Sequence, residues 1–428
     1  MPAHRRRLVP LALLAAAAAG AACSEDIEGG AACPLLCPEQ NVVVLDTVLE
    51  PVVLDTTVAG YPTTGTESWL VLARDGSTLD VRPVVRFDSL TMFYSGNEPD
   101  TTIEVIDSTY VRLRIDTTFS RVTAPVTIDV FDVDTIAGDS AAAANDTSIA
   151  KERLLFRDDR LLGTITLAPD EIGDSILVPL DDAAVLDKII NQRRLRLGFR
   201  LTSSEPAELL ILSREGGDAP VVRYDPAPAD SEIGHLTVQP LSKTPRNQVV
   251  LAADLTDYVH VFSAPAIPAG PYLAAGNLPG HRIFMRFSIP PRILDSSNVL
   301  RATLVLTQVP APSPEADSAL DLFPRLVTAG VVVQEPGRAA FLANPPRLGF
   351  DSLRVVPSDS GEVEVEVVNA VRAWSFDPRR TAQQALILSS KFEGMRAPFA
   401  MFFSSEAPPE VRPRLRVSYS PVRTFGVP

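Results

Sequence analysis

Histidines and carboxylates are the side chains of this chain that could carry acid–base or metal chemistry. Only three histidines follow residue 22, at His235, His260 and His281. Asp254, Asp257 and His260 are spaced three apart and would share one face of a helix as metal ligands. The surrounding segment LTDYVHVF is rich in β-branched and aromatic residues, which favours a strand and would separate the three side chains. We therefore expect ordinary strand and turn residues here, with a metal site as the alternative.

Common catalytic spacings are missing from the sequence. It contains no G-x-S-x-G, no H-E-x-x-H and no phosphate-binding loop. We therefore do not expect an enzyme. A polysaccharide hydrolase needs only two carboxylates at a fixed separation in a cleft. Because the chain has 53 acidic residues, a hydrolase, or an accessory domain of one, stays open as the alternative.

Clustered acids are weak candidates for calcium ligands, since β-sandwich modules bind this ion through loop oxygens. Asp129, Asp132 and Asp134 form one such cluster, without the spacing and glycine of an EF-hand. Glu362, Glu364 and Glu366 alternate along a second segment. In both segments we expect a solvated acidic face, and no cofactor other than calcium is suggested.

Four side chains could contact a bound ligand. Trp69 follows the polar segment TGTES and could stack on a sugar ring, whereas Trp374 follows an apolar run and is expected in the core. Arg86 and Arg286 occupy equivalent positions in two similar segments, VVRFD and FMRFS. Trp69, Arg86 and Arg286 are thus the binding candidates, with core packing or a structural salt bridge as the more ordinary role.

The N-terminus indicates an extracytoplasmic address. Arg5–Arg7 precede an apolar run, Leu8–Ala22, which is too short to span a bilayer comfortably and is typical of a signal peptide. The run ends at Cys23 after Gly-Ala-Ala, which resembles the lipobox of bacterial lipoproteins except that Gly20 replaces the usual leucine. The resemblance implies lipidation of Cys23 and anchoring of the protein at the outer membrane or cell surface. Plain secretion after cleavage at Ala21 is the alternative.

Cys33 and Cys37 are the only other cysteines. In an oxidising compartment such a pair is typical of a small disulfide loop, with free thiols as the alternative. Residues 23–40 are rich in Gly, Pro, Ser and acids and are expected to form a disordered tether.

Composition limits the partners. The net charge of −14 argues against nucleic acid, because phosphate binding needs clustered cations. Like-charge repulsion instead favours a soluble monomer. The remaining partners are the lipid bilayer, through the N-terminal lipid, and an envelope polysaccharide or a surface protein.

Strand patterns dominate the chain. Period-two alternation is clear in segments 110–115 and 362–367, and many short β-branched runs are broken by Pro, Gly, Asp and Ser. Helical spacing is limited to residues 181–192 and to a short segment, VVNAVRAW. The pattern predicts an all-β protein of antiparallel, jelly-roll-like sandwiches.

An internal repeat organises these strands. The segment from Arg193 to Pro226 is repeated from Gln383 to Pro421, and in both an apolar run ends in Ser-Arg-Glu or Ser-Ser-Glu before a final strand. We predict a signal peptide at 1–22, then two tandem sandwich domains at 41–233 and 234–421 with separate cores. On that division residues 234–421 should fold alone. Residues 137–152 and 308–350 interrupt the repeat as inserted loops.

The second copy resembles a known family. The order R-F, E-V-x-x-A-V-x-x-W, L-I-L-S-S and F-S-S-E-A-P-P-E-x-R-P-R-L-x-V-x-Y, over residues 257–419, is similar to the DNRLRE-type domain, a carbohydrate-binding-module-like β-sandwich of bacterial surface proteins. The first copy, over residues 69–224, matches less well. The resemblance implies an extracellular binding or scaffolding role and carries no catalytic residues. The expected function is thus a membrane-anchored, non-catalytic binding or structural module of the cell envelope.

Overall fold

The computed structural model describes residues 43–60, 65, 67–94, 101–134, 156–226, 234–241, 256–343, 351–377 and 381–422. The predictions for the signal peptide, the tether, Cys23, Cys33, Cys37 and the inserted loop at 137–152 lie outside these residues. Within them, no helix combines the length and apolar character that crossing a membrane would require.

The first sandwich pairs an eight-stranded antiparallel sheet with a four-stranded one. The larger sheet has the order β10-β9-β12-β4-β3-β13-β8, with β16 added on β4, and the smaller has the order β11-β7-β14-β15. Their apolar faces enclose one core, to which β3, β9 and β12 contribute from one side and β7, β11 and β14 from the other. The strands are β3 (Trp69–Asp75), β4 (Leu79–Phe87), β7 (Thr109–Arg114), β8 (Arg121–Val122), β9 (Val126–Asp132), β10 (Leu161–Leu167), β11 (Ser175–Pro179), β12 (Leu195–Ser203), β13 (Ala207–Leu212), β14 (Val221–Tyr224), β15 (Leu236–Val238) and β16 (Asp257–Ser263), beside a small β5 (Phe93–Tyr94) and β6 (Thr101–Thr102) pair.

The second sandwich is one eleven-stranded sheet that folds over itself. One layer has the order β1-β25-β19-β24-β17 with β22 on β19, and the other has the order β18-β23-β20-β21 with β2 on β18. Among the described strands the ladder passes from one layer to the other at Gly276, on β17, opposite His281, on β18, and a second core fills the space between the layers. The strands are β1 (Leu45–Leu49), β2 (Val52–Ala59), β17 (Tyr272–Gly276), β18 (His281–Phe287), β19 (Ser297–Val309), β20 (Leu320–Leu326), β21 (Leu353–Val355), β22 (Gly361–Glu366), β23 (Ala385–Ser390), β24 (Phe399–Phe403) and β25 (Arg414–Pro421).

The sequence patterns explain the local structure. In β7 the residues alternate strictly between buried and half-buried, and in β25 Leu415, Val417 and Tyr419 face the core as the alternation predicts. The all-β antiparallel sandwich prediction is therefore confirmed. The prediction for one segment was wrong. Residues 308–350 are not simply a loop, because they contain β20, which pairs with β23.

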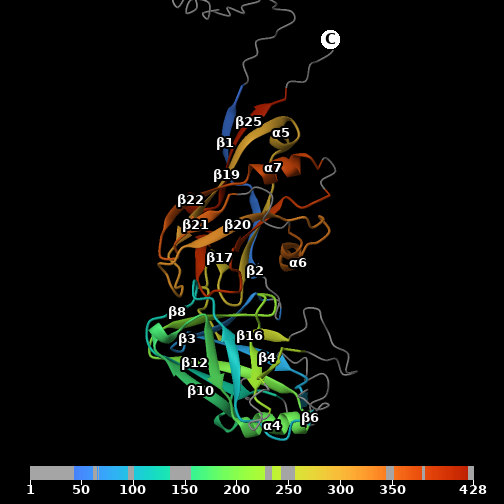
Figure 1. Cartoon of the computed structure of the whole chain (residues 1–428). Coiled ribbons are helices and arrows are strands. Elements are labelled where there is room, and N and C mark those ends of the chain that lie inside the picture. The colour runs from blue at the N-terminus through green and yellow to red at the C-terminus, as the bar shows by residue number, and fades with distance from the viewer. Residues whose placement is uncertain are drawn as a thin grey trace, which may run out of the picture. The chain divides into compact units, whose positions relative to one another are not determined.

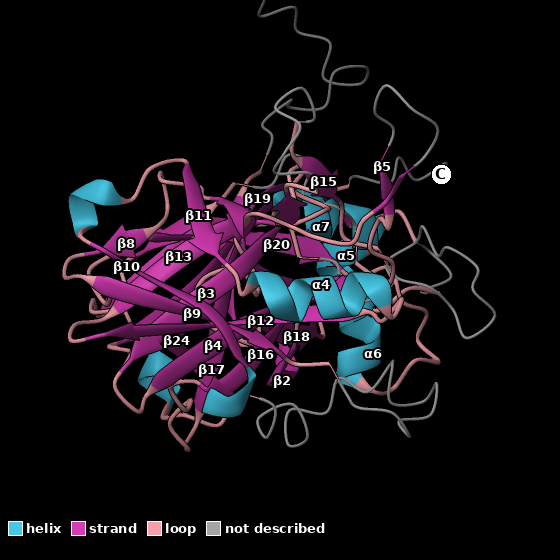
Figure 2. Cartoon of the chain, turned by 60° about the horizontal axis from the view of Figure 1, so that its bottom comes forward, coloured by secondary structure: helices cyan, strands magenta, loops and turns pink. Residues whose placement is uncertain are grey.

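The described helices are few and short (Figure 2). The segment predicted at 181–192 is α4 (Asp182–Ile190), whose first turn is capped by the Asp181 carboxylate accepting from the Ala184 N–H at 2.9 Å. The VVNAVRAW segment is α7 (Val368–Ser375). Its Trp374 is buried against Phe287, with ring centroids 5.6 Å apart. The remaining described α-helices are α5 (Pro291–Leu294) and α6 (Pro336–Phe341).

The two repeats exchange their first strands. β2 lies in the first half of the chain but pairs along β18 of the second sandwich, and β16 lies in the second half but pairs along β4 of the first. In Figure 1 the blue β2 accordingly lies among strands coloured yellow to red. The N-terminal β1 likewise pairs with β25. The boundaries predicted at 41 and 234 are therefore wrong as limits of the sandwiches, because each sheet takes an edge strand from the other repeat.

Side chains from both sandwiches also share a third apolar cluster. It joins Val71, Ala73 and Leu210 of the first sandwich to Leu278 and Ala397 of the second. The two sandwiches belong to one compact unit. Two separate cores were predicted; the structure has two large apolar clusters and this third cluster, which the sandwiches share.

Candidate functional site

Trp69, the predicted sugar-stacking residue, is covered by other aromatic rings. It lies at the start of β3, with its ring centroid 5.6 Å from that of Phe119 and 5.4 Å from that of Phe392. Phe392 comes from the second sandwich, between β23 and β24. Trp69, which is half-buried, is therefore part of the packing between the sandwiches.

The two predicted binding arginines occupy sheet interiors. Arg86 is 2% exposed and donates to the Asp88 carboxylate at 2.9 Å. Arg286 is half-buried in β18, between Leu54 on β2 and Ala385 on β23. Neither position offers a guanidinium on an open surface, which favours the structural role.

The acidic cluster predicted as a weak calcium site is held by cations of the protein. Asp129 pairs with Arg200 at 2.9 Å, Asp132 with Lys188 at 2.6 Å and Asp134 with Arg194 at 2.5 Å. Burial raises the pKa of Asp134, although Arg194, Lys188 and Arg196 oppose this. No group of three metal-ligating side chains is present in the described part of the chain. The cluster is thus a set of ion pairs, not a preformed cation site.

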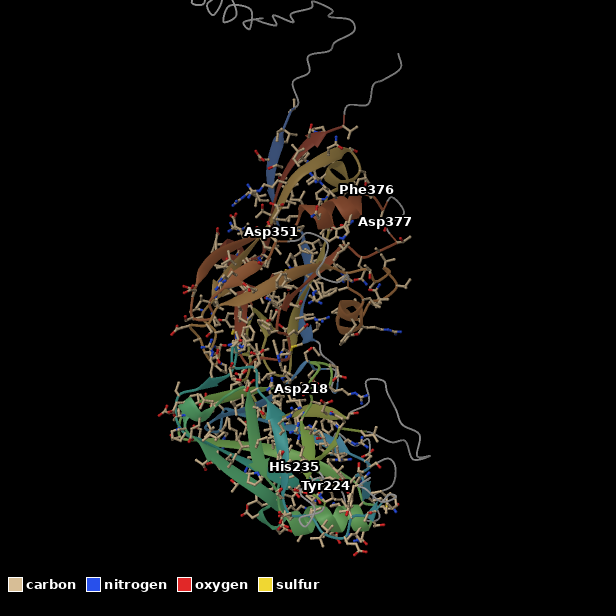
Figure 3. All side chains as sticks on the ribbon, in the orientation of Figure 1. Asp218, Tyr224, His235, Asp351, Phe376 and Asp377 are labelled. Carbon is tan, nitrogen blue, oxygen red and sulfur yellow. The ribbon has the colours of Figure 1, made fainter. Side chains whose placement is uncertain are left out.

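Other acids are paired in the same way. On β22, Glu364 pairs with Arg416 at 2.9 Å, and Glu366 with Arg301 at 3.1 Å. Asp218, labelled in Figure 3, contacts Arg112 at 2.8 Å and Arg114 at 3.1 Å. Of the three residues of the metal alternative, Asp257 and His260 are buried on strand β16, as the β-branched flanks indicated, and Asp254 lies outside the described residues.

A polar hollow lies in the second sandwich, where the edges of its two layers part. We call it the slot. It has a volume of about 430 Å³, and its residues come from β2, β17, the start of β18, the loop before β17 and the turn after β24. It is lined by Asp55, Thr56, Thr57, Ile267, Gly270, Tyr272, Leu273, His281, Ser404 and Glu406.

Hydrogen bonds fix the polar wall of the slot. Both carboxylate oxygens of Asp55 accept from Ser405, one from its N–H at 2.7 Å and one from its hydroxyl at 2.8 Å. The Thr57 hydroxyl accepts from the Ala274 N–H at 2.9 Å, which ties β2 to β17. These bonds hold the polar side chains of the slot in place.

The rest of the lining consists of an aromatic ring and hydrogen-bonding groups, none of which is a cationic side chain. The half-buried Tyr272 ring lies 5.6 Å from that of Phe403. Burial lowers the pKa of His281, so its imidazole is neutral at pH 7. Glu406 is exposed, and the lining contains no lysine or arginine. Such a lining accepts hydrogen bonds from hydroxyl groups and repels anions.

The first sandwich has residues at the positions that correspond to the slot, but they are packed against the second sandwich. Trp69 pairs with Leu212 as Tyr272 pairs with Phe403, and in each case a serine follows. Asp257, equivalent to Asp55, is 2% exposed and accepts from the Arg214 N–H at 2.8 Å. Thr57 and His281 are replaced by Val259 and Val81. Tyr272 of the slot therefore occupies the position that Trp69 has in the other repeat, and the repeated Ser-x-Glu was the sequence signal available for the slot.

Comparisons with known proteins identify no relative. No family model matches the chain, and no curated protein matches it. Among solved structures, the tandem CBM22-1–CBM22-2 domain of Paenibacillus barcinonensis Xyn10C is 8% identical, with a TM-score of 0.15 over 87% of this chain and 100% of that one. The C-terminal domain of the Streptococcus pyogenes antigen I/II-family protein AspA is 8% identical, with a TM-score of 0.16 over 84% and 92%. Likenesses this weak establish neither a common fold nor a common function.

Proposed function

We propose that this chain is a non-catalytic binding module, anchored in the bacterial cell envelope by a lipid on Cys23, which holds a neutral, hydroxyl-rich ligand such as a polysaccharide in the slot. The observation that carries the proposal is the slot itself, in which the Tyr272 ring lies beside oriented acceptors. Sugar hydroxyls donate to carboxylates and threonine hydroxyls, and a sugar ring packs on an aromatic face.

The arrangement of the carboxylates favours binding over hydrolysis. A glycoside hydrolase uses one carboxyl group as acid and a second as base or nucleophile. In the slot both oxygens of Asp55 accept hydrogen bonds from Ser405, so this carboxylate already has a structural role in closing the turn. Glu406 is the other carboxylate of the lining. Among the described hydrogen bonds, its backbone N–H donates to Ser404 and its carboxylate is not tied to a turn as that of Asp55 is.

A glycan array probed with the chain lacking residues 1–23 tests the ligand class. We expect signals from neutral polysaccharides and none from sulfated or uronic acid polymers. Tyr272→Ala should abolish binding, whereas Tyr110→Ala, which removes a half-buried tyrosine from the first sandwich, should leave it unchanged. A blank array, or binding that survives Tyr272→Ala, would contradict the proposal and favour a scaffold for a protein partner.

Anchoring is tested separately. Mass analysis of the mature protein should find a lipidated Cys23 as its first residue, and Cys23→Ser should release the protein from the membrane fraction. An unmodified N-terminus at Ala22 would show plain secretion.

A further inference from the structure

The contact between the two sandwiches contains a cluster of four charged side chains, of which Glu208 and Arg396 are buried, Glu315 is half-buried and Arg121 is exposed. Glu208, on β13, is 5% exposed and faces the second sandwich together with Leu210. Glu315 and Arg396 come from the second sandwich, and Arg121 comes from β8 of the first. These three are the charged groups that surround Glu208 from the elements packed on it.

Both arginines of this cluster pair with Glu315. It pairs with Arg121 at 2.8 Å and accepts a hydrogen bond from Arg396. The Glu208 carboxyl, by contrast, has a buried oxygen, Oε1, without a hydrogen-bond partner among the described residues. An ionised carboxylate in this position would be desolvated beside a second carboxylate whose cations are already engaged, and that is costly.

We propose that the contact between the sandwiches is a proton-dependent lock, which is closed while Glu208 is protonated and loosens when Glu208 ionises. Desolvation, followed by the repulsion of Glu315, raises the pKa of Glu208 to about 8. A raised pKa means that the closed form binds one more proton than the open form, so the contact is strongest at low pH and weakens as the pH rises towards 8. This inference does not depend on the ligand of the slot.

The opening should be partial. The exchanged strands β2 and β16 keep the two sandwiches connected through their ladders, so loss of the proton would part the faces without separating the sandwiches. The aromatic group formed by Trp69, Phe119 and Phe392 lies on the same contact. Trp69 and Ala73 lie on the same face of β3, four residues apart, and Ala73 pairs with Glu208 on β13. It therefore reports on the contact.

The chain has two tryptophans, so Trp374→Phe leaves Trp69 as the single reporter. In the full-length Trp374→Phe protein we expect acrylamide quenching to increase at least twofold between pH 6 and pH 9.5, with a midpoint near pH 8 and an unchanged far-UV spectrum. Adding Glu208→Gln, a neutral isostere, should keep Trp69 protected across this range. Adding Glu364→Gln, at an ion pair on the outside of the second sandwich, should leave the transition in place.

Two outcomes would overturn the lock. One is a transition that is unchanged by Glu208→Gln, and the other is a flat quenching profile in the Trp374→Phe protein. Glu315→Gln gives a second test should Glu208→Gln fail to fold. It removes the neighbouring negative charge and frees two arginines, so the midpoint should move to lower pH by about one unit, and an unmoved midpoint would also contradict the proposal.

Discussion

Asp55 and Asp257 occupy the same position on the two exchanged strands, β2 and β16. Each accepts a hydrogen bond from a turn of the sandwich that its strand joins. Asp55 pairs with Met285 and accepts hydrogen bonds from Ser405, while Asp257 pairs with Val85 and accepts from the Arg214 N–H. Both turns belong to the repeated Ser-x-Glu segments. The exchange is thus fixed by side chains as well as by backbone ladders.

Removing the Asp55 carboxylate should destabilise the protein through the second sandwich. Asp55→Ala leaves the N–H and hydroxyl of Ser405 without their acceptor, which costs about 1–3 kcal/mol of the free energy of unfolding. Urea denaturation followed by circular dichroism measures this loss. Asp46→Ala, which removes an exposed aspartate from the adjacent edge strand β1, is the control and should change the stability far less. Equal losses in the two variants would show that the turn does not depend on Asp55.

Asp257 should make stability fall as the pH rises. Burial raises its pKa from 3.8 to about 6 in the folded protein, although the Arg214 N–H opposes this. Since the folded state holds the proton more tightly, its contribution is complete below pH 3.8 and is lost as the pH rises through 6. Asp257→Asn should flatten that part of the curve. Chemical denaturation at pH 4, 5, 6 and 7 checks the slope, and identical slopes in both proteins would contradict the assignment.

Residues 234–421 should not fold alone, contrary to the sequence prediction. This fragment lacks β1 and β2, so the edges of β25 and β18 are unpaired, and its β16 has lost its partner β4. Exposed edges of this kind promote aggregation. We expect the fragment to aggregate in size-exclusion chromatography.

A permuted fragment provides the matched control. Because Leu45 pairs with Tyr419, a short hairpin linker can join residue 422 to residue 43, so that 264–422 is followed by 43–60. This protein contains every strand of the second sandwich and should be soluble, with a cooperative melt. Aggregation of the permutant together with solubility of 234–421 would refute the exchange.

Gly60 should not tolerate a side chain. A Cβ at this position would lie 1.9 Å from Oε1 of Glu393. That carboxylate holds the buried Arg282 through contacts of 2.6 and 2.8 Å. Gly60→Ala must therefore displace Glu393 from Arg282, and should cost about 1–3 kcal/mol of stability. In Gly173→Ala the new Cβ meets nothing within 4 Å, so its thermal midpoint should match that of the wild type. A wild-type midpoint for Gly60→Ala would contradict the contact.

Much of the fold could be predicted because local patterns decide it. The alternation in β7 and β25 places one face of each strand on a core, and the spacing of Val185 and Ile189 predicts α4. The exchange could not be predicted in this way. β4 and β18 offer equivalent edges, and period-two alternation says nothing about which edge a given strand joins.

The slot was predictable only in part. Repetition brings Tyr272 into register with Trp69 and Ser404 into register with Ser213, so the aromatic position and the turn could be found. What covers Trp69 is Phe392, which lies more than 300 positions later in the chain. Only the packing between the sandwiches shows which repeat is closed and which is open.

The strand exchange also sets the path that a pulling force would take. A load that enters the chain at Leu45 meets β1 first, whose five residue pairs with β25 would open one after another from the Leu45–Tyr419 end. It next meets β2 on β18, still in the second sandwich. The half that comes later in the chain would thus bear tension from the N-terminus before the half that comes earlier, and β1, which gives only Leu49 to the second core, would yield first.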